Sequence, residues 1–269
     1  MTKMTKPDIS PDDQPVKVIS LRDNFYFVKE WYDLANESHF WIQWRLVVLK
    51  KMLSRLGVSL QEHLHCVDVG CGNSVLRKQM ESISQWLVDG FELDRYALTL
   101  SSRTRGQLFL YDIRDRSPAF SGKFDVLTMF DILEHYHDSE AFLQDAKFHL
   151  KAGGYCIINV PAIELLRSRY DEVAGHELRY NQKILRKHIE AVGFEILDMQ
   201  YWGFSLIFPL WVRRFVVSGC EDGGEVIRKG FTPPGKWIHG MLKVIARIET
   251  TLFPRVPFGT SIMVIARKR

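Results

Sequence analysis

The sequence predicts an α/β fold with a doubly wound parallel sheet and helices on both faces. Between residues 65 and 160, short runs rich in β-branched and aromatic residues alternate with helical stretches, and this alternation is typical of βαβ units. A glycine-rich turn, Gly70-Cys71-Gly72, directly follows the first run, as in many ligand-binding turns between a strand and a helix. With 269 residues, 46% of them hydrophobic, the chain is long enough for one such domain and an appended region.

The individual elements follow from local periodicity and from turn residues. Helices are predicted at 24–56, 75–83 and 181–192, and a turn at Lys151–Gly154 is expected to end a helix. Strands are predicted at 65–69, 86–93, 107–111, 124–130, 155–160, 194–201 and 260–266. The predicted organisation is a disordered tail (1–23), an N-terminal helical lid (24–62), a ligand-binding core (63–202), an insertion (203–259) and a last core strand (260–269).

Acidic residues follow three consecutive predicted strands. Asp68 lies at the end of the first, Glu92 at the end of the second and Asp112 at the end of the third. Because parallel strands end at the same edge of a sheet, these carboxylates should lie close together. They would repel a pyrophosphate, and Val75 replaces the third glycine of the dinucleotide pattern. S-adenosylmethionine, which carries an ammonium and a sulfonium, suits this charge better.

Five motifs in the predicted core resemble those of the class I S-adenosylmethionine-dependent methyltransferases. They are residues 67–72 (VDVGCG), 90–94 (GFELD), 111–113 (YDI), 124–127 with 133–135 (FDVL and LEH), and 150–154 (LKAGG). The flanks around 39–45 and 257–261 are similar to a bacterial subgroup with small-molecule or lipid-type acceptors. The resemblance implies a Rossmann-like, seven-stranded sheet whose last strand is antiparallel, with S-adenosyl-L-methionine as the cofactor.

The cofactor-binding residues are predicted at the ends of the first four strands. Glu92 is placed to accept hydrogen bonds from the ribose hydroxyls, and Asp112 is placed to meet the adenine amino group. Asn73 and Ser74 stand where many relatives have another glycine, and asparagine tolerates left-handed backbone geometry. The full predicted set is Asp68, Gly70, Cys71, Gly72, Glu92, Leu93, Asp112, Ile113 and Phe130.

Methyl transfer depends mainly on positioning, but a hydroxyl acceptor benefits from a general base. His176, in a polar loop after the fifth strand, is the first candidate, and His135 is the second. Asp131 is a further carboxylate at the end of the fourth strand, and His39 would arrive with the lid. For each histidine a packing or capping role is the alternative. The four cysteines fall singly, so no metal site is predicted and reduced thiols are expected.

The insertion is apolar and basic. Residues 203–259 contain eight Lys or Arg against four Asp or Glu. Apolar residues at 238, 241, 245, 248 and 252 recur at helical spacing, with Lys236, Lys243 and Arg247 on another face. In one interpretation, such a basic amphipathic helix lies on an anionic membrane or holds a lipid-linked acceptor. In the other, it packs on the core or on a second subunit.

The predicted function is methyl transfer from S-adenosylmethionine to an oxygen, rather than a nitrogen or carbon, of a small or lipid-like acceptor. One alternative is a NAD-dependent oxidoreductase on a related fold, and another is a catalytically idle module that binds a membrane surface or a partner. No nucleic-acid partner is expected, because the sequence has no arginine-rich tract or RNA-binding module. The N-terminus lacks the apolar stretch of a secretory signal. The predicted location is the cytoplasm, with peripheral contact at the inner membrane face left open.

Overall fold

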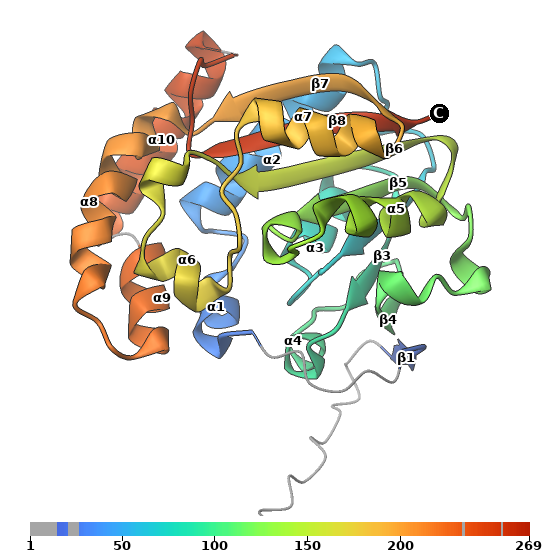
Figure 1. The fold of residues 1–269 in the computed structure, drawn as a ribbon, viewed down its shortest axis with the longest axis horizontal. Coiled ribbons are helices and arrows are strands. Elements are labelled where there is room, and N and C mark those ends of the chain that lie inside the picture. The colour runs from blue at the N-terminus through green and yellow to red at the C-terminus, as the bar shows by residue number, and fades with distance from the viewer. Residues whose placement is uncertain (1–14, 21–26, 233–234, 254) are drawn as a thin grey trace, which may run out of the picture.

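A single eight-stranded sheet forms the centre of the computed structural model, which describes every residue except 1–14, 21–26, 233–234 and 254 (Figure 1). The strand order is β1-β4-β3-β2-β5-β6-β8-β7. Neighbouring strands are parallel except where β8 pairs with β6 and β7, so the predicted doubly wound sheet with an antiparallel last strand is confirmed. The strands are β1 (Val16–Val18), β2 (His65–Val69), β3 (Leu87–Glu92), β4 (Leu108–Leu110), β5 (Phe124–Phe130), β6 (Leu150–Pro161), β7 (Phe194–Trp202) and β8 (Ser261–Lys268).

Strand β1 corrects two predictions, the count of seven strands and disorder throughout residues 1–23. Val16–Val18 pair in parallel with Leu108–Leu110 of β4, and the backbone N–H groups of Ile19 and Ser20 donate to the Leu110 carbonyl. Without β1, strand β4 would present an unpaired edge, and pairing satisfies its backbone groups. Residues 1–14 of the predicted tail lie outside the described residues.

Two further boundaries differ from prediction. Lys151–Gly154 is not a separate turn but lies within β6, where the register against β5 shifts. The helix predicted at 24–56 is divided into α1 (Lys29–Leu34) and α2 (Phe40–Arg55), and its residues 24–26 lie outside the described residues. The break has a local cause, because the Nδ1 atom of His39 accepts a hydrogen bond from the Trp41 backbone at 3.3 Å and so caps the start of α2.

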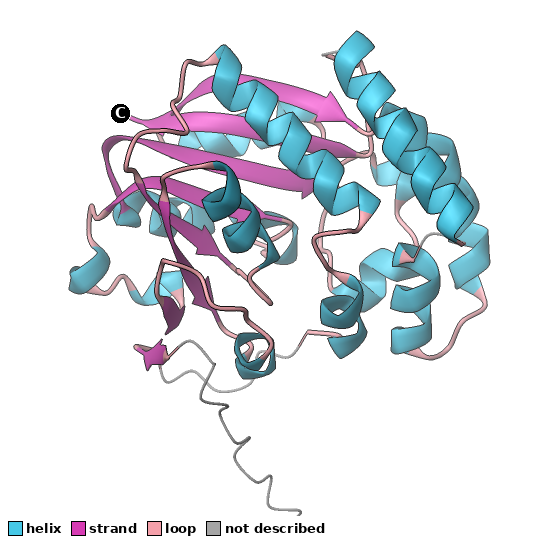
Figure 2. Ribbon diagram, turned by 180° about the vertical axis from the view of Figure 1, so that it is seen from behind, coloured by secondary structure: helices cyan, strands magenta, loops and turns pink. Residues whose placement is uncertain are grey.

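Helices cover both faces of the sheet (Figure 2). On one face, α5 and α7 pack against the strands through Phe142, Leu143, Leu185 and other buried residues. On the other face, α2, α3 and α10 contribute to a second core. The helices that follow α2 are α3 (Val75–Ile83), α4 (Arg95–Thr99), α5 (Ser139–His149), α6 (Arg169–Ala174), α7 (Gln182–Ala191), α8 (Ile207–Ser218), α9 (Gly223–Phe231) and α10 (Lys236–Leu252).

The insertion forms a helical cap at one end of the molecule. Helices α8 and α9 lie there beside α1 and α6, beyond the carboxyl ends of the strands (Figures 1 and 2). A separate apolar cluster joins these four helices through residues such as Tyr170, Val217 and Val226, with Trp31 of α1 packed against it. Among the described residues, no helix combines the length and the apolar character that a membrane span requires.

Candidate functional site

A cavity of about 390 Å³ lies between the carboxyl ends of the strands and the helical cap. One wall comes from the loops after β2, β3, β4 and β5, and the other comes from α1, α6, α8 and α9. Its volume falls within the range of small-ligand sites, and open α/β sheets bind ligands at this edge. The cavity therefore marks the candidate active site, and the cap residues that line it come from the predicted lid and insertion.

The loop after β2 is shaped by glycine. Gly70 and Gly72 have φ angles of 67° and 53°, in the left-handed region. A side chain at Gly70 would collide with Ile132, and one at Gly72 would come within 3.3 Å of the Tyr32 ring. Both glycines line the cavity, so the loop presents bare backbone at this wall.

Ser74, and not Asn73, adopts the left-handed geometry expected at the place of another glycine. Its φ angle is 67°. The Asn73 side-chain amide instead donates to the carbonyls of Tyr32 and Ala35, each at 2.9 Å. The prediction for Asn73 is therefore corrected: this side chain fastens the loop to α1.

Glu92 organises the loop and also faces the cavity. Its Oε2 atom accepts from the Gly72 N–H at 2.6 Å, and its Oε1 atom accepts from the N–H groups of Leu93 and Asp94 at 2.7 and 2.8 Å. Burial raises the pKa of Glu92, although these three N–H groups oppose the rise. A carboxylate has about four lone-pair sites, so Glu92 retains the capacity to accept from ribose hydroxyls.

The cavity brings together seven of the nine predicted cofactor-binding residues. These are Gly70, Gly72, Glu92, Leu93, Asp112, Ile113 and Phe130. Asp112 lines the wall, but Arg114 binds both of its oxygens, with the shortest contact 2.6 Å, so an adenine amino group would have to share this carboxylate.

The two remaining predicted residues, Asp68 and Cys71, are buried but do not belong to the cavity lining. The Oδ1 atom of Asp68 accepts from the Thr128 hydroxyl at 2.7 Å, and burial raises the pKa of Asp68 to about 6. Asp68 therefore lies behind the loop rather than at its surface.

Asp131, the residue after β5, is held in an unusual backbone conformation. Its φ of 59° is rare for a residue other than glycine. Arg45 of α2 donates to Oδ2 at 2.6 Å, and the Asn159 amide donates to Oδ1 at 2.8 Å. These contacts fix the carboxylate at the cavity wall, and they oppose the burial that raises the pKa of Asp131 above its usual range.

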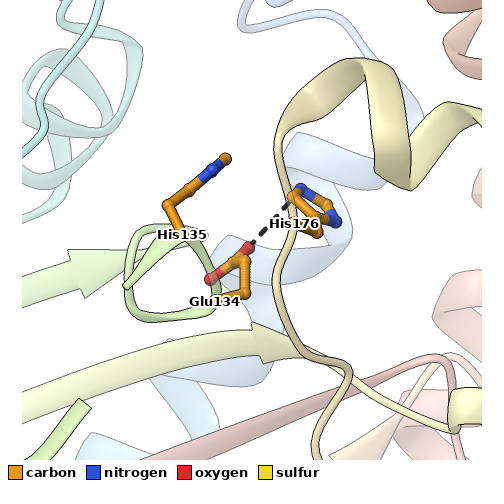
Figure 3. A group of neighbouring side chains, drawn as sticks. All are labelled: Glu134, His135 and His176. Carbon is orange, nitrogen blue, oxygen red and sulfur yellow. Dashed lines mark ion pairs between the residues drawn. The ribbon is translucent and has the colours of Figure 1, made fainter. Parts of the chain in front are cut away.

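His176 and His135 meet beside a buried carboxylate, Glu134 (Figure 3). The Nδ1 atom of His176 lies 2.9 Å from Oδ1 of Asp171, and its Nε2 atom lies 3.9 Å from Oε1 of Glu134. Although burial favours protonation of Asp171, His176 and Arg179 hold the pKa of this carboxyl well below its usual range. Asp171 thus orients the imidazole and leaves Nε2 directed toward the cavity side of Glu134.

His135 is arranged in a similar way. Its Nδ1 atom lies 3.1 Å from the Gly175 carbonyl oxygen, while burial and the neighbouring His176 lower its pKa to about 4. Neither oxygen of Glu134 has a hydrogen-bond partner among the described residues, and burial raises the pKa of this carboxyl well above its usual range.

Donor atoms of Glu134, His135 and His176 all lie within 4.8 Å of one another. Two imidazoles and a carboxylate are ligands that divalent transition metals accept. In addition, each imidazole is oriented through its Nδ1 atom, as ligand histidines usually are. The three residues therefore form a set that could hold a cation, although no metal site was predicted from the sequence.

His39 has a packing role and is not available as a base. The cavity also contains residues that the sequence did not indicate. The His39 ring stacks on Phe231 with centroids 4.1 Å apart, and both of its nitrogens are engaged, with Nε2 3.1 Å from the Phe231 carbonyl. The packing alternative therefore describes His39. Cavity residues missed from the sequence include Trp31, Tyr32, Tyr170, Arg179 and Arg213.

Comparisons with known proteins agree with this geometry. The profile of a family described as a methyltransferase domain matches residues 40–199, more than half of the chain. Over 142 residues the chain is 27% identical to the ubiquinone biosynthesis O-methyltransferase of Parvibaculum lavamentivorans. That match covers 48% of this chain and 56% of the relative, so it spans little more than half of the relative's length.

Two solved structures share the fold. The [4+2]-cyclase SpnF is 17% identical, with 78% of this chain and 76% of that chain covered and a TM-score of 0.52. The phosphoethanolamine N-methyltransferase 2 of Haemonchus contortus, in complex with S-adenosyl-L-methionine, is 16% identical, with 80% and 51% covered and a TM-score of 0.50. At such identities the likeness shows the fold alone. A cyclase and a methyltransferase share it, so the reaction must be argued from the site.

Proposed function

The chain belongs to the class I S-adenosylmethionine-dependent methyltransferases, and from that premise we propose that it methylates an oxygen atom of a small, lipid-like acceptor. The observation that carries the proposal is one continuous cavity, which extends from Gly72 and Glu92 to His176. A donor bound at the glycine loop and an acceptor beside the imidazole would therefore share one cavity. Such an arrangement favours direct transfer between two bound molecules.

The donor side suits S-adenosylmethionine. Gly70 and Gly72 present backbone without side chains to the cavity, and Glu92 offers acceptor capacity for ribose hydroxyls. Leu93, Ile113 and Phe130 supply apolar walls for the adenine. Asp68 and Cys71 would support the loop from behind, and Asp68 would also act on the cofactor through its charge. When bound, S-adenosylmethionine supplies a methyl group on a sulfonium, which becomes a neutral thioether as the acceptor oxygen attacks.

On the acceptor side, His176 is the proposed general base. Its Nε2 atom takes the proton of the acceptor hydroxyl while the new oxygen–carbon bond forms, and Asp171 stabilises the resulting imidazolium through Nδ1 at 2.9 Å. His135 and Asp131 would position the acceptor, because His135 is neutral at pH 7 and Asp131 is already bound by Arg45. An imidazole oriented for proton transfer supports an oxygen acceptor, and the name of the O-methyltransferase relative agrees.

The lipid-like character of the acceptor is supported by the cap. Leu206, Leu210 and Phe231 line the cavity, and the outer faces of α8 and α10 expose large apolar side chains, including Phe208 and Trp237. A protein that takes its acceptor from a membrane surface would present such a face beside its cavity. Peripheral contact with an anionic membrane is therefore part of the proposal.

The proposal is tested with a labelled methyl donor. Purified protein is incubated with cell extract and labelled S-adenosylmethionine, and mass spectrometry identifies the product, which should be a methyl ether of an apolar compound. His176→Asn should lower turnover by about 100-fold or more, as loss of a general base does, while its affinity for S-adenosylhomocysteine stays unchanged. Unaltered turnover in His176→Asn would remove the base from the mechanism.

A chelator separates a free base from a metal-bound imidazole. If His176 acts alone, turnover should persist after treatment with EDTA and gel filtration. If turnover is lost and then returns with manganese or zinc, the cluster of Glu134, His135 and His176 holds a cation and His176 is a ligand. A product that carries the labelled methyl group on nitrogen or carbon would contradict the oxygen assignment in either case.

A further inference from the structure

Arg213 presents unpaired hydrogen-bond donors in the wall of the cavity. It projects from α8 and lines the same cavity as His176. Its Nη1 atom donates to the Gly230 carbonyl at 3.2 Å, and its guanidinium carbon lies 4.3 Å from the centre of the Tyr170 ring. The Nε and Nη2 atoms are shielded from solvent and have no hydrogen-bond partner among the described residues.

This lack of pairing distinguishes Arg213 from the other arginines at this end of the sheet. Arg45 pairs with Asp131 at 2.6 Å, and Arg179 pairs with Asp171 at 2.8 Å. No carboxylate among the described residues forms an ion pair with Arg213. An arginine shielded from water without an anion is costly, and burial together with the nearby Arg179 lowers the pKa of Arg213. The protein therefore presents a cation that lacks a counter-ion.

The position of the unpaired atoms indicates what could bind there. Nε and Nη2 form one edge of the planar guanidinium, and two parallel N–H groups on such an edge match two oxygens of a carboxylate or a phosphate. The remaining contacts of Arg213, with Gly230 and Tyr170, fix the plane of the fork. The site is therefore preorganised, and binding an oxyanion would not require the side chain to reorient.

We propose that Arg213 binds an oxyanion, a carboxylate or phosphate group, that is part of the methyl acceptor. The Tyr170 ring connects this subsite to the proposed base, because Arg213 stacks on Tyr170 and the Tyr170 and His176 ring centroids are 6.5 Å apart. The acceptor thus carries a hydroxyl and an anionic group on one small scaffold, together with its apolar part. This inference rests on the proposed function and narrows its acceptor class to anionic, hydroxylated amphiphiles.

The test uses matched probes that differ only in charge. Calorimetry on protein saturated with S-adenosylhomocysteine compares 4-hydroxybenzoate with 4-hydroxybenzamide, with inorganic phosphate as a third probe. Hydrogen bonds to charged groups contribute about 1.5–3 kcal/mol, which corresponds to roughly 10-fold to 100-fold in affinity. Wild-type protein should bind the benzoate at least about 10-fold more tightly than the benzamide. Arg213→Gln should abolish the preference, and Arg213→Lys should keep part of it because it retains charge without the fork.

Arg214→Gln is the matched control, because it removes the same charge from the adjacent residue, which is not part of the cavity lining. It should keep the full preference. An unchanged affinity of Arg213→Gln for S-adenosylhomocysteine would establish that the variant is folded. Equal binding of both probes by wild-type protein would overturn the inference, as would a preference for the benzoate, or binding of inorganic phosphate, that survives in Arg213→Gln.

These results are independent of turnover. Charge-selective binding without methyl transfer to any acceptor would support the subsite and contradict the proposed function. Methyl transfer only to uncharged acceptors would support the function and overturn the subsite.

Discussion

Asp68 is 2% exposed on β2, and its Oδ1 atom accepts a hydrogen bond from the Thr128 hydroxyl at 2.7 Å. Burial raises its pKa from 3.8 to about 6, against the pull of Thr128 and Arg45. The unfolded chain therefore releases this proton at lower pH than the folded protein does. Folding becomes less favourable as the pH rises from about 4 to about 6, and the penalty stays constant above that range. The charge is retained at a cost in stability, which is consistent with a functional use.

We predict that Asp68→Asn stabilises the protein in a pH-dependent manner. Asparagine keeps an acceptor for Thr128 and carries no charge, so the penalty of about 3 kcal/mol at neutral pH should disappear. Urea unfolding should show the variant more stable than wild type at pH 7.5, by about 2 kcal/mol more than at pH 4.5. Glu195→Gln, which removes a half-buried carboxylate of β7 that pairs with Arg267 of β8, is the control and should show no such gain. A stability difference that does not vary with pH would contradict the assignment.

At the scale of elements, α10 has two different apolar sides. Ala246 is buried in the core beside α2, but Ile238, Met241, Ile248 and Leu252 of the predicted apolar stripe are exposed. A second stripe, at Trp237, Met241, Val244, Ile248 and Leu252, is at least 50% exposed at every position. Lys236, Lys243 and Arg247 lie next to this stripe along the helix. Packing on the core therefore accounts for one side only, and the exposed stripe with its basic neighbours fits an anionic bilayer surface.

We predict that vesicles containing anionic phosphatidylglycerol bind the protein and that neutral phosphatidylcholine vesicles bind it weakly. Trp237, 93% exposed, should enter the interface, so Trp237→Ser should weaken co-sedimentation by about 10-fold, given about 1.5–3 kcal/mol for burial of a large apolar side chain. Leu100→Ser, at an exposed position after α4, should leave binding unchanged. Equal binding of both vesicle types, or no loss in Trp237→Ser, would exclude a membrane role for this helix.

At the scale of the whole molecule, features encoded by neighbouring residues could be predicted. Contacts between residues far apart in the sequence could not. The strand at 124–130 was predicted at its exact bounds, and Gly70, Gly72 and Glu92 were placed at the cavity, because strand patterns and tight turns are encoded in neighbouring residues. Arg114 binding Asp112, Thr128 binding Asp68, and Val16–Val18 joining the sheet all depend on side-chain direction or on long-range pairing. Arg213 is the clearest case, since its place in the cavity depends on how α8 packs on α6.

Contacts between residues far apart in the sequence also connect the lid helix α1 to the loops after β2 and β3. The Tyr32 hydroxyl of α1 donates to Asp94 at 3.1 Å, and the Asn73 amide donates to two carbonyls at the end of α1. Helix α9 packs on α1 in turn. A ligand between the loop and Tyr32 would therefore restrain the lid and the insertion together, because each holds the next in place.

We predict that S-adenosylhomocysteine at 100 times its Kd stabilises the protein by about 2.7 kcal/mol and slows hydrogen exchange in α1 as well as in the loop after β2. Asn73→Ala should reduce the protection of α1 by about 30-fold, since it removes two hydrogen bonds of about 1 kcal/mol each, while the loop stays protected. Helix α7, outside the cavity lining, is the internal control and should exchange at the same rate with and without ligand. If α1 exchanges equally fast in both states while the loop is protected, cofactor binding and lid closure are separate events, and the acceptor site would have to close by a movement of α8 or α9 instead.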